Sequence, residues 1–566
     1  MFTLRYRKLL VLFSGAVIGT LIVFGLAIYA QANYQQHNAY FFDAVYYQSY
    51  NASLAQRLQT ESRFTVALDE WLHNNRHPLR TTPLVLFTPA LLTNPYGHLV
   101  SVGLTFTLLL TLVGYLVFTR RQSIFLALTT QLFFIGLPIL YDVNRGIANY
   151  WLEWGATLWL GCALCCILLA ADFPKQQRWI IGFAVSAAAA VLSRYIAGVF
   201  VAVVCIVPFV FFLWQRWIIQ KRWRDVGISL LIPGGIIFGL AGYFLVAHFS
   251  SNVAFYNNYG YAINQTFASS WSFICTSLLA MWQLQGDRFP KLFIYTGIII
   301  VIISIILTLR RQTIKHWLIA IWISVATPLT LLALGTVGAF HPLLYGLFPL
   351  LAAGLFSAPQ QTFHKWQKIM QSVLIGLVIF TIMVSINQQR LRISTLAQQI
   401  ITPEKFMNQQ IADGLNQAAN EPIVWQAFFD EYSTIPTMEL YFSTGKLALP
   451  AGQPYFNQHL TAWKVDYPGL TKEQVAERVY SATNKWVDVA VVFADPAKGI
   501  QSSWIDNEYS SYMVDYMSRT IQTDPHWQKI FTIQSGYSPD LYGYRNMQPT
   551  NNSYKLILDD NQLVKP

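Results

Sequence analysis

The stretch FFDAVYYQSY, residues 41 to 50, sets one carboxylate, Asp43, among aromatic side chains shortly after a long apolar run. If residues 40 to 60 form a helix, Asp43, Tyr47 and Tyr50 fall on one face at positions i, i+4 and i+7. Such a face can hold a hydroxyl group, and a carboxylate within hydrogen-bond reach could take the hydroxyl proton as a general base. The alternative for Asp43 is a helix N-cap or an ordinary surface carboxylate.

The segment LDEWLHNNRHPLRTTP, which begins at residue 68, carries a second group of ionisable side chains. They are Asp69, Glu70, His73, Arg76, His77 and Arg80. Prolines at 78, 83 and 89 disfavour a continuous spanning helix, so we predict a short interfacial helix followed by a broken re-entrant or packing segment. His73 and His77 would share a helix face as metal ligands, but Pro78 disfavours that helix, and we predict no metal.

Further charged residues stand at the ends of apolar runs. The stretch YDVNRGIANYWLEWG contains Arg145 and Glu153, and VLSRYIAGV places Arg194 between two apolar halves. An arginine in that position either meets an anion or extends toward lipid headgroups. The late stretch GAFHPLLYGLFPLLAAG adds His341 and Tyr345.

The composition explains why charged residues at the ends of apolar runs are candidates for function. The chain is 54% hydrophobic and 11% charged, and its mean hydropathy is +0.38, values that describe a membrane protein. A helix needs roughly 20 apolar residues to cross a bilayer, and runs of that kind predict a polytopic α-helical membrane protein with about eleven transmembrane helices. The predicted spans are 8–30, 98–118, 122–140, 151–171, 179–193, 195–214, 226–248, 292–309, 317–338, 341–357 and 369–387.

The loop charges predict an orientation for these spans. With the N-terminus in the cytoplasm, the cytoplasmic connections RRQ, KQQR, RWIIQKRWR, RRQTIKHW and HKWQK are short and basic. The outer connections 31–97, 141–150 and 249–291 are longer and nearly balanced in charge. We therefore predict a membrane module over residues 1–387, with 31–97 as its first outer loop, and we attribute the net charge of +11 to topology rather than to nucleic-acid binding.

The remainder, residues 388–566, is predicted to be a soluble α/β domain on the outer face. PIVWQAFF and WVDVAVVFAD indicate buried strands, TKEQVAERVYSATNK and NEYSSYMVDYMSRTIQ indicate amphipathic helices, and WQKIFTIQSGYSPDLYGYRN indicates a closing hairpin. None of the five cysteines lies in residues 388–566, so no disulfide framework is implied for this domain.

With this topology, several of the singled-out residues share the outer membrane face. Arg145, Arg194 and His341 form a candidate phosphate-binding rim, because guanidinium groups match phosphate oxygens by geometry. Tyr256, in the loop stretch YNNYGY, would suit a sugar or a lipid headgroup, although an ordinary polar loop is the alternative.

These residues together resemble a known family, the GT-C superfamily of integral-membrane glycosyltransferases, in particular the bacterial branch similar to protein O-mannosyltransferases and lipid A aminoarabinose transferases. The matching features are Asp43 after the first span, the Tyr46–Tyr47 pair, HPL at 77–79, Arg145, Arg194 and HPLLYGLFP at 341–349. Three positions depart from the family pattern: Ala44 replaces a second acidic residue, Leu79 replaces a second proline, and His341 replaces an arginine.

The resemblance implies a GT-C fold and an inverting hexosyl or pentosyl transfer from a polyprenyl-phosphate-linked sugar. Asp43 would be the catalytic base, Arg145, Arg194 and His341 would bind the donor phosphate, and no cofactor is expected. Acceptor or sugar contacts would come from Tyr46, Tyr47, Asp69, Glu70, His77, Glu153, Tyr256 and Tyr345. The acceptor, a lipid, glycan or protein, would enter from outside the cell membrane.

Two other functions fit the same membrane charges. A transporter or flippase could pass a lipid-linked solute, although the sequence lacks the inverted repeats that many transporters show. A non-catalytic assembly subunit of the cell envelope would keep the fold without the chemistry.

Overall fold

The computed structural model describes residues 2–38, 42–74, 77–136, 138–141, 146–150, 152–220, 223–250, 401–418, 423–428, 434–450, 469–502, 508–534 and 540–548, together with isolated positions between 319 and 394. The chain divides into two compact units. Unit 1 comprises Met1–Gln31 and Leu58–Thr395, and unit 2 comprises Ala32–Arg57 and Leu396–Pro566. The second cut falls close to the predicted boundary after residue 387, whereas the grouping of residues 32–57 with the C-terminal part was not predicted.

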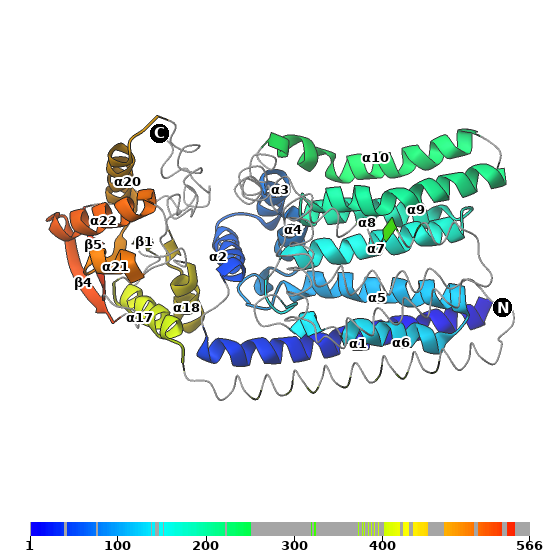
Figure 1. Cartoon of the computed structure of the whole chain (residues 1–566), viewed down its shortest axis with the longest axis horizontal. Coiled ribbons are helices and arrows are strands. Elements are labelled where there is room, and N and C mark those ends of the chain that lie inside the picture. Colours follow the sequence, from blue (N-terminus) through cyan, green and yellow to red (C-terminus); the bar gives the residue numbers. More distant parts are fainter. Residues whose placement is uncertain are drawn as a thin grey trace, which may run out of the picture. The chain divides into compact units, whose positions relative to one another are not determined.

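Unit 1 is helical, and its long helices run alongside one another (Figure 1). Among the described residues, five helices are long and apolar enough to cross a membrane: α1 (Phe2–His37), α5 (Leu99–Arg121), α7 (Leu152–Asp172), α9 (Ala197–Gln220) and α10 (Trp223–Ala247). Shorter apolar helices are α6 (Ile124–Ile135) and α8 (Gln177–Ser193). The predictions of a multi-pass helical membrane protein and of these helices are therefore confirmed.

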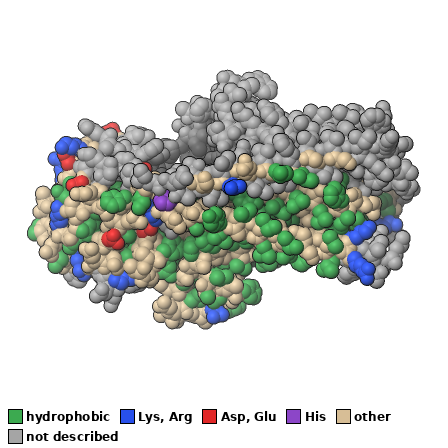
Figure 2. All heavy atoms as spheres, turned by 90° about the horizontal axis from the view of Figure 1, so that it is seen from below, with side chains coloured by type: hydrophobic (Ala, Val, Ile, Leu, Met, Phe, Trp, Pro, Cys, Tyr) green, Lys and Arg blue, Asp and Glu red, His purple; other side chains and the backbone are tan. Residues whose placement is uncertain are grey.

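The lipid-facing character of unit 1 is visible on its surface. Large apolar side chains such as Leu21, Leu104 and Leu231 are 66%, 73% and 75% exposed. Figure 2 shows one face of the molecule, on which hydrophobic side chains cover much of the surface that is not grey. Contiguous exposed apolar surface of this kind is rare on soluble proteins and is expected where lipid covers it.

Some predicted bounds were wrong. The span predicted over 122–140 is shorter, because α6 ends at Ile135 with Gly136 as its C-cap, and Pro138 opens the 3-10 helix η2 (Pro138–Tyr141). The predicted hairpin at Arg194 is confirmed, since α8 ends at Ser193 and α9 begins at Ala197. The spans predicted from residue 292 onward lie outside the described residues, apart from isolated positions.

Polar contacts join the ends of unit 1 helices where the basic loops stand. Arg120, at the end of α5, donates from Nε and Nη2 to Asp172, at the end of α7, at 2.7 and 3.0 Å. Arg216 in α9 donates to the carbonyl of Pro174 at 2.9 Å. Lys8 in α1 lies 5.1 Å from the ring centre of Phe118. The first three basic loops of the predicted cytoplasmic side therefore share one end of the described helices.

The short helices between α1 and α5 form differently. Ser62 accepts a hydrogen bond from the Thr65 N–H at 3.1 Å and thereby caps α3 (Arg63–His73). Pro78 occupies the first turn of α4 (Pro78–Phe87), where a missing N–H costs nothing, and α4 continues through Pro83. A 3-10 turn, η1 (Pro89–Leu91), follows. None of the three elements is long enough to span a bilayer, as predicted.

Unit 2 contains a five-stranded sheet in the order β2-β1-β3-β5-β4. The first three strands, β2 (Leu449–Pro450), β1 (Val424–Phe428) and β3 (Val489–Phe493), are parallel, and β5 (Leu541–Asn546) and β4 (Trp527–Ile533) form an antiparallel hairpin. β1 and β3 are buried along their whole length, as expected from uninterrupted apolar runs. The two predicted strands and the predicted hairpin are confirmed.

Five described helices precede or alternate with these strands along the chain. They are α17 (Pro403–Ala418), α18 (Thr434–Thr444), α20 (Lys472–Trp486), α21 (Pro496–Ser502) and α22 (Glu508–Thr523). α20 begins with a capping box in which Thr471 and Gln474 exchange hydrogen bonds. The two helices predicted from amphipathic patterns are therefore confirmed as α20 and α22, and their apolar faces join the core around Trp425.

Candidate functional site

A buried polar network joins α3 to α4. Glu70, Asn74 and His77 are 3%, 8% and 3% exposed. The Asn74 amide nitrogen lies 3.0 Å from Glu70 Oε2, 2.9 Å from His77 Nδ1 and 3.3 Å from Thr81 Oγ1. The His77 backbone N–H donates to Asn74 Oδ1 at 3.0 Å. Asn74 therefore fixes a carboxylate and an imidazole on two consecutive helices.

Arg80 extends the network toward the start of α7. Its side chain is buried, and the guanidinium carbon lies 4.3 Å from the ring centre of Tyr150, within cation–π range. The Tyr150 ring in turn lies 4.7 Å from the ring of His98, whose Nε2 is 3.3 Å from the Ile147 carbonyl. Burial, together with the charge of Arg80, lowers the pKa of His98, which precedes the α5 span. Arg80 is thus the fixed positive charge of this group.

Arg194 approaches the same helix start from α8. It is the C-cap of α8, with its backbone N–H bonded to Ala190 at 3.1 Å. Its Nη2 lies 3.2 Å from Oε1 of Glu153, in the first turn of α7, and the two side chains are 19% and 12% exposed. Of the two alternatives for Arg194, an anion or the lipid headgroups, the structure shows an anionic partner, Glu153. Tyr150 and Glu153, only three residues apart, therefore bring Arg80 and Arg194 to one helix end.

Two of the predicted contact residues differ sharply in environment. Glu70 is buried in the network, whereas the Asp69 side chain is 40% exposed and lies 2.8 Å from His73 Nδ1. His77 is the N-cap of α4 and is buried. The helix face that would pair His73 with His77, which Pro78 was expected to disfavour, does not form, because α3 ends at His73. Among the described residues, no group of three or more His, Cys, Asp or Glu side chains is arranged to hold a metal.

Asp43 belongs to unit 2, on α2 (Phe42–Arg57), so the helix on which the proposed face of Asp43, Tyr47 and Tyr50 depends forms over most of residues 40 to 60. Tyr47 is 9% exposed, and the side chains of Asp43 and Tyr46 lie outside the described part of the structure. Arg145, Tyr256, His341 and Tyr345 also lie outside the described residues, and their roles stay predictions.

The sequence alone does not single out Arg80, Asn74 and Tyr150, which the structure brings together at this site. Arg80 was noted among six ionisable residues, but nothing distinguished it from its neighbours. Its signal is positional: it follows Pro78 in a mostly apolar segment, where a charged side chain is costly and therefore a functional candidate.

Comparison with known proteins gives the fold a class. No protein-family model matches the sequence, and no curated protein matches it. Two solved structures of ArnT from Cupriavidus metallidurans do match. The one bound to undecaprenyl phosphate has a TM-score of 0.51 at 12% identity, covering 92% of this chain and 97% of that one. The apo structure has a TM-score of 0.50 at 10% identity, covering 93% and 97%. The chain therefore shares the fold of these two ArnT structures over most of its length, a fold of the kind that the sequence resemblance implied.

Proposed function

We propose that the protein is an inverting glycosyltransferase that moves a sugar from a polyprenyl-phosphate-linked donor to an acceptor hydroxyl. The observation that carries the proposal is that Arg80 contacts Tyr150 and Arg194 contacts Glu153, so that both arginines lie near the start of α7, inside a helical membrane unit. Buried or half-buried guanidinium groups at the end of apolar helices suit an anion that arrives from the lipid. The fold shared with an ArnT structure bound to undecaprenyl phosphate supports the choice of a polyprenyl phosphate.

The charge distribution supports an orientation. The basic ends with Arg120, Arg178 and Arg216 lie opposite the end with Arg80 and Arg194, because α7 runs from Glu153 to Asp172. Short basic connections mark the cytoplasmic side. We therefore assign the arginine pair, and the sheet-containing unit 2, to the outer face of the cell membrane, with the N-terminus in the cytoplasm.

In the proposed reaction the acceptor hydroxyl attacks the anomeric carbon, and the bond from that carbon to the phosphate oxygen breaks. Asp43 takes the hydroxyl proton as general base. The bond electrons leave with the polyprenyl phosphate, whose added negative charge is stabilised by Arg194 and Arg80 and, in the predicted rim, by Arg145 and His341. A single displacement inverts the anomeric configuration and needs no covalent enzyme intermediate.

The test is release of polyprenyl phosphate by the purified, detergent-solubilised protein. A panel of polyprenyl-phosphate sugars serves as donors, with cell-envelope extracts as acceptors. Wild type should turn over at least one donor, and Asp43→Asn should not. Asp515→Asn is the matched control, because this carboxylate lies on α22 of the same unit and pairs with Arg519 at 2.8 Å, away from α2.

Each outcome has a distinct meaning. Turnover that Asp43→Asn abolishes and Asp515→Asn retains supports both the reaction and the base. Turnover that survives in Asp43→Asn keeps the reaction but moves the base to Asp69, Glu70 or Glu153. Absence of turnover with every donor, in a folded protein, would overturn the proposal in favour of a transporter or an assembly subunit.

A further inference from the structure

α18 of unit 2 has two buried faces with different partners. On one face Leu440 belongs to the core of the sheet, and the hydroxyl of Thr437 accepts a hydrogen bond from the indole N–H of Trp425 on β1 at 2.8 Å. On the other face Ile435 and Met438, which are 2% and 1% exposed, pack against α2. α18 therefore connects the sheet to the helix that carries Asp43.

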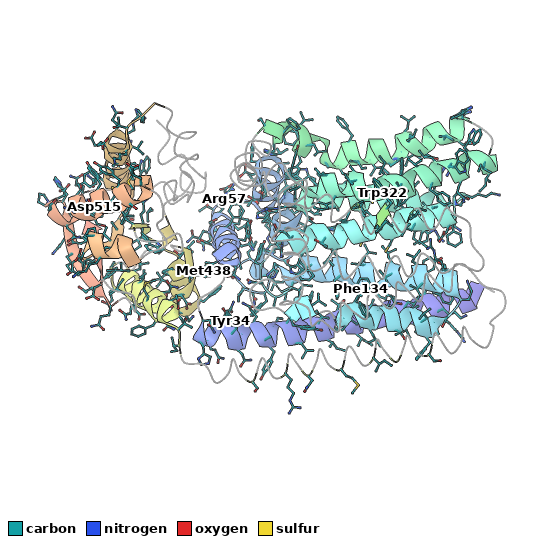
Figure 3. All side chains as sticks on the ribbon, viewed as in Figure 1. Tyr34, Arg57, Phe134, Trp322, Met438 and Asp515 are labelled. Carbon is teal, nitrogen blue, oxygen red and sulfur yellow. The ribbon has the colours of Figure 1, made fainter. Side chains whose placement is uncertain are left out.

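The contact uses one side of α2. Val45 packs with Ile435 and Met438, and Ala52 packs with Leu447, just beyond the end of α18. At 3.6 residues per turn, position 43 lies about 200° from Val45 and about 180° from Ala52 around the helix. Position 43 is thus on the opposite side of α2 from the residues that pack against α18. α18 therefore supports α2 on the side away from position 43. Figure 3 labels Met438 on α18 and Arg57 at the end of α2.

α18 is itself held in place by charge and backbone contacts. Lys405 of α17 forms an ion pair with Glu439 of α18, and the two side chains are only 5% and 13% exposed. The backbone N–H of Thr402, directly before α17, donates to the carbonyl of His37 at 2.8 Å. The last residue of α1 and the start of α17 are therefore joined just before the chain enters α2. The support behind α2 is a fixed part of unit 2.

We propose that Met438 and Ile435 are positioning residues for the transfer reaction: through α2 they set where the base at position 43 stands. The inference rests on the proposed function and extends it to unit 2, whose packing would then control turnover without touching substrate. Displacing a general base by about 1 Å can lower a rate roughly 100-fold, so a small cavity behind α2 is sufficient for a large effect.

The test compares two methionines of unit 2 that are equally buried. Met438→Ala opens a cavity against α2, whereas Met517→Ala opens one inside the sheet core, where Met517 of α22 is 0% exposed. Turnover is normalised to the folded fraction, measured by thermal unfolding. We expect Met438→Ala to lower kcat roughly 10- to 100-fold with donor KM changed less than about twofold, and Met517→Ala to leave both unchanged.

A conservative variant separates positioning from loss of folding. Met438→Leu nearly conserves side-chain volume and should restore kcat to within about threefold of wild type. Equal kcat for Met438→Ala and Met517→Ala, after normalisation, would overturn the inference. So would a fall in kcat that Met438→Leu does not rescue, because that result would indicate an effect other than packing.

Hydrogen exchange distinguishes a failure of this inference from a failure of the proposed function. The amides of α2 should exchange faster in Met438→Ala than in Met517→Ala. Faster exchange with unchanged kcat would overturn the positioning role alone. If wild type shows no turnover with any donor, the proposed function falls and the positioning role falls with it, whatever the exchange shows.

Discussion

Two ion pairs stand at opposite ends of α7, and they differ in design. Asp172, at the last residue, receives two hydrogen bonds from Arg120 at 2.7 and 3.0 Å, and the Arg120 side chain is 6% exposed. Glu153, in the first turn, lies 3.2 Å from an Arg194 that is 19% exposed and caps the end of a helix. The 21 residues of α7 separate the two pairs by about 30 Å.

The two ion pairs therefore suit different roles. A two-point contact between helix ends fixes one geometry and suits a structural connection between α5 and α7. The longer contact at the hairpin tip between α8 and α9 is made by one nitrogen, and in the proposed site Arg194 would exchange Glu153 for the donor phosphate. We therefore expect the two ends of α7 to respond oppositely to mutation, with stability affected at one and turnover at the other.

The largest expected effect is at the structural end. Asp172→Asn removes the carboxylate that neutralises a buried guanidinium, which costs about 3–5 kcal/mol in comparable cases. Thermal unfolding in detergent should shift markedly downward, while turnover per folded molecule stays at the wild-type value. Unchanged unfolding, or lost turnover with intact unfolding, would contradict the structural assignment.

Arg194→Ala should show the converse pattern. Removing a donor to developing negative charge costs roughly 100-fold in rate, whereas a partly exposed residue at a helix end contributes little to stability. The measurement is release of polyprenyl phosphate, with Arg194→Lys as the matched variant that keeps the charge but not the planar geometry. Lysine should recover part of the rate. Full activity in the alanine variant would exclude Arg194 from donor binding.

Glu153→Gln tests the same end of α7 in the other direction, because this substitution is expected to increase the affinity for polyprenyl phosphate. In the proposed site Glu153 would compete with the donor phosphate for Arg194, so neutralising Glu153 should tighten binding of polyprenyl phosphate. For a pair worth about 1 kcal/mol the gain is about fivefold. Affinity is measured by equilibrium binding of the lipid phosphate to the detergent-solubilised protein. Weaker binding would show instead that Glu153 holds Arg194 in the binding geometry.

The smallest expected effect is on the pH dependence of stability, and it comes from Asp524, a hydrogen-bonded carboxylate in unit 2. Burial raises the pKa of Asp524, but hydrogen bonds from the Tyr480 hydroxyl and the His526 N–H outweigh it, and the pKa falls below its ordinary value of 3.8. Because the pKa is lower in the folded state, the ionised Asp524 stabilises the fold above pH 3.8. This contribution to stability is lost as the pH falls through the folded-state pKa. Thermal unfolding of wild type and Asp524→Asn should therefore converge below about pH 3.8. A constant difference across the acid range would contradict this origin.

Elements with strong local signals were predictable from sequence. The apolar runs of β1 and β3, the amphipathic patterns of α20 and α22, and the long apolar helices of unit 1 each depend on neighbours in the chain. The packing of Val45 on Ile435 could not be predicted in this way, because the whole membrane module separates the two residues in the sequence. Arg80 could not be separated from nearby charges without its burial against Tyr150. The basic residue Arg120 was interpreted only as a topological signal, although it also joins two helices.

The split composition of unit 2 has a consequence for how the protein is made. Residues 32–57 are synthesised long before residues 396–566, which complete the same unit. At ribosomal speeds of about 5–20 residues per second, the interval is on the order of tens of seconds. During that interval the nascent α2 has no α18 to cover Val45 and Ala52. We therefore expect the apolar side of residues 32–57 to stay uncovered until translation of the C-terminal part of unit 2 is finished.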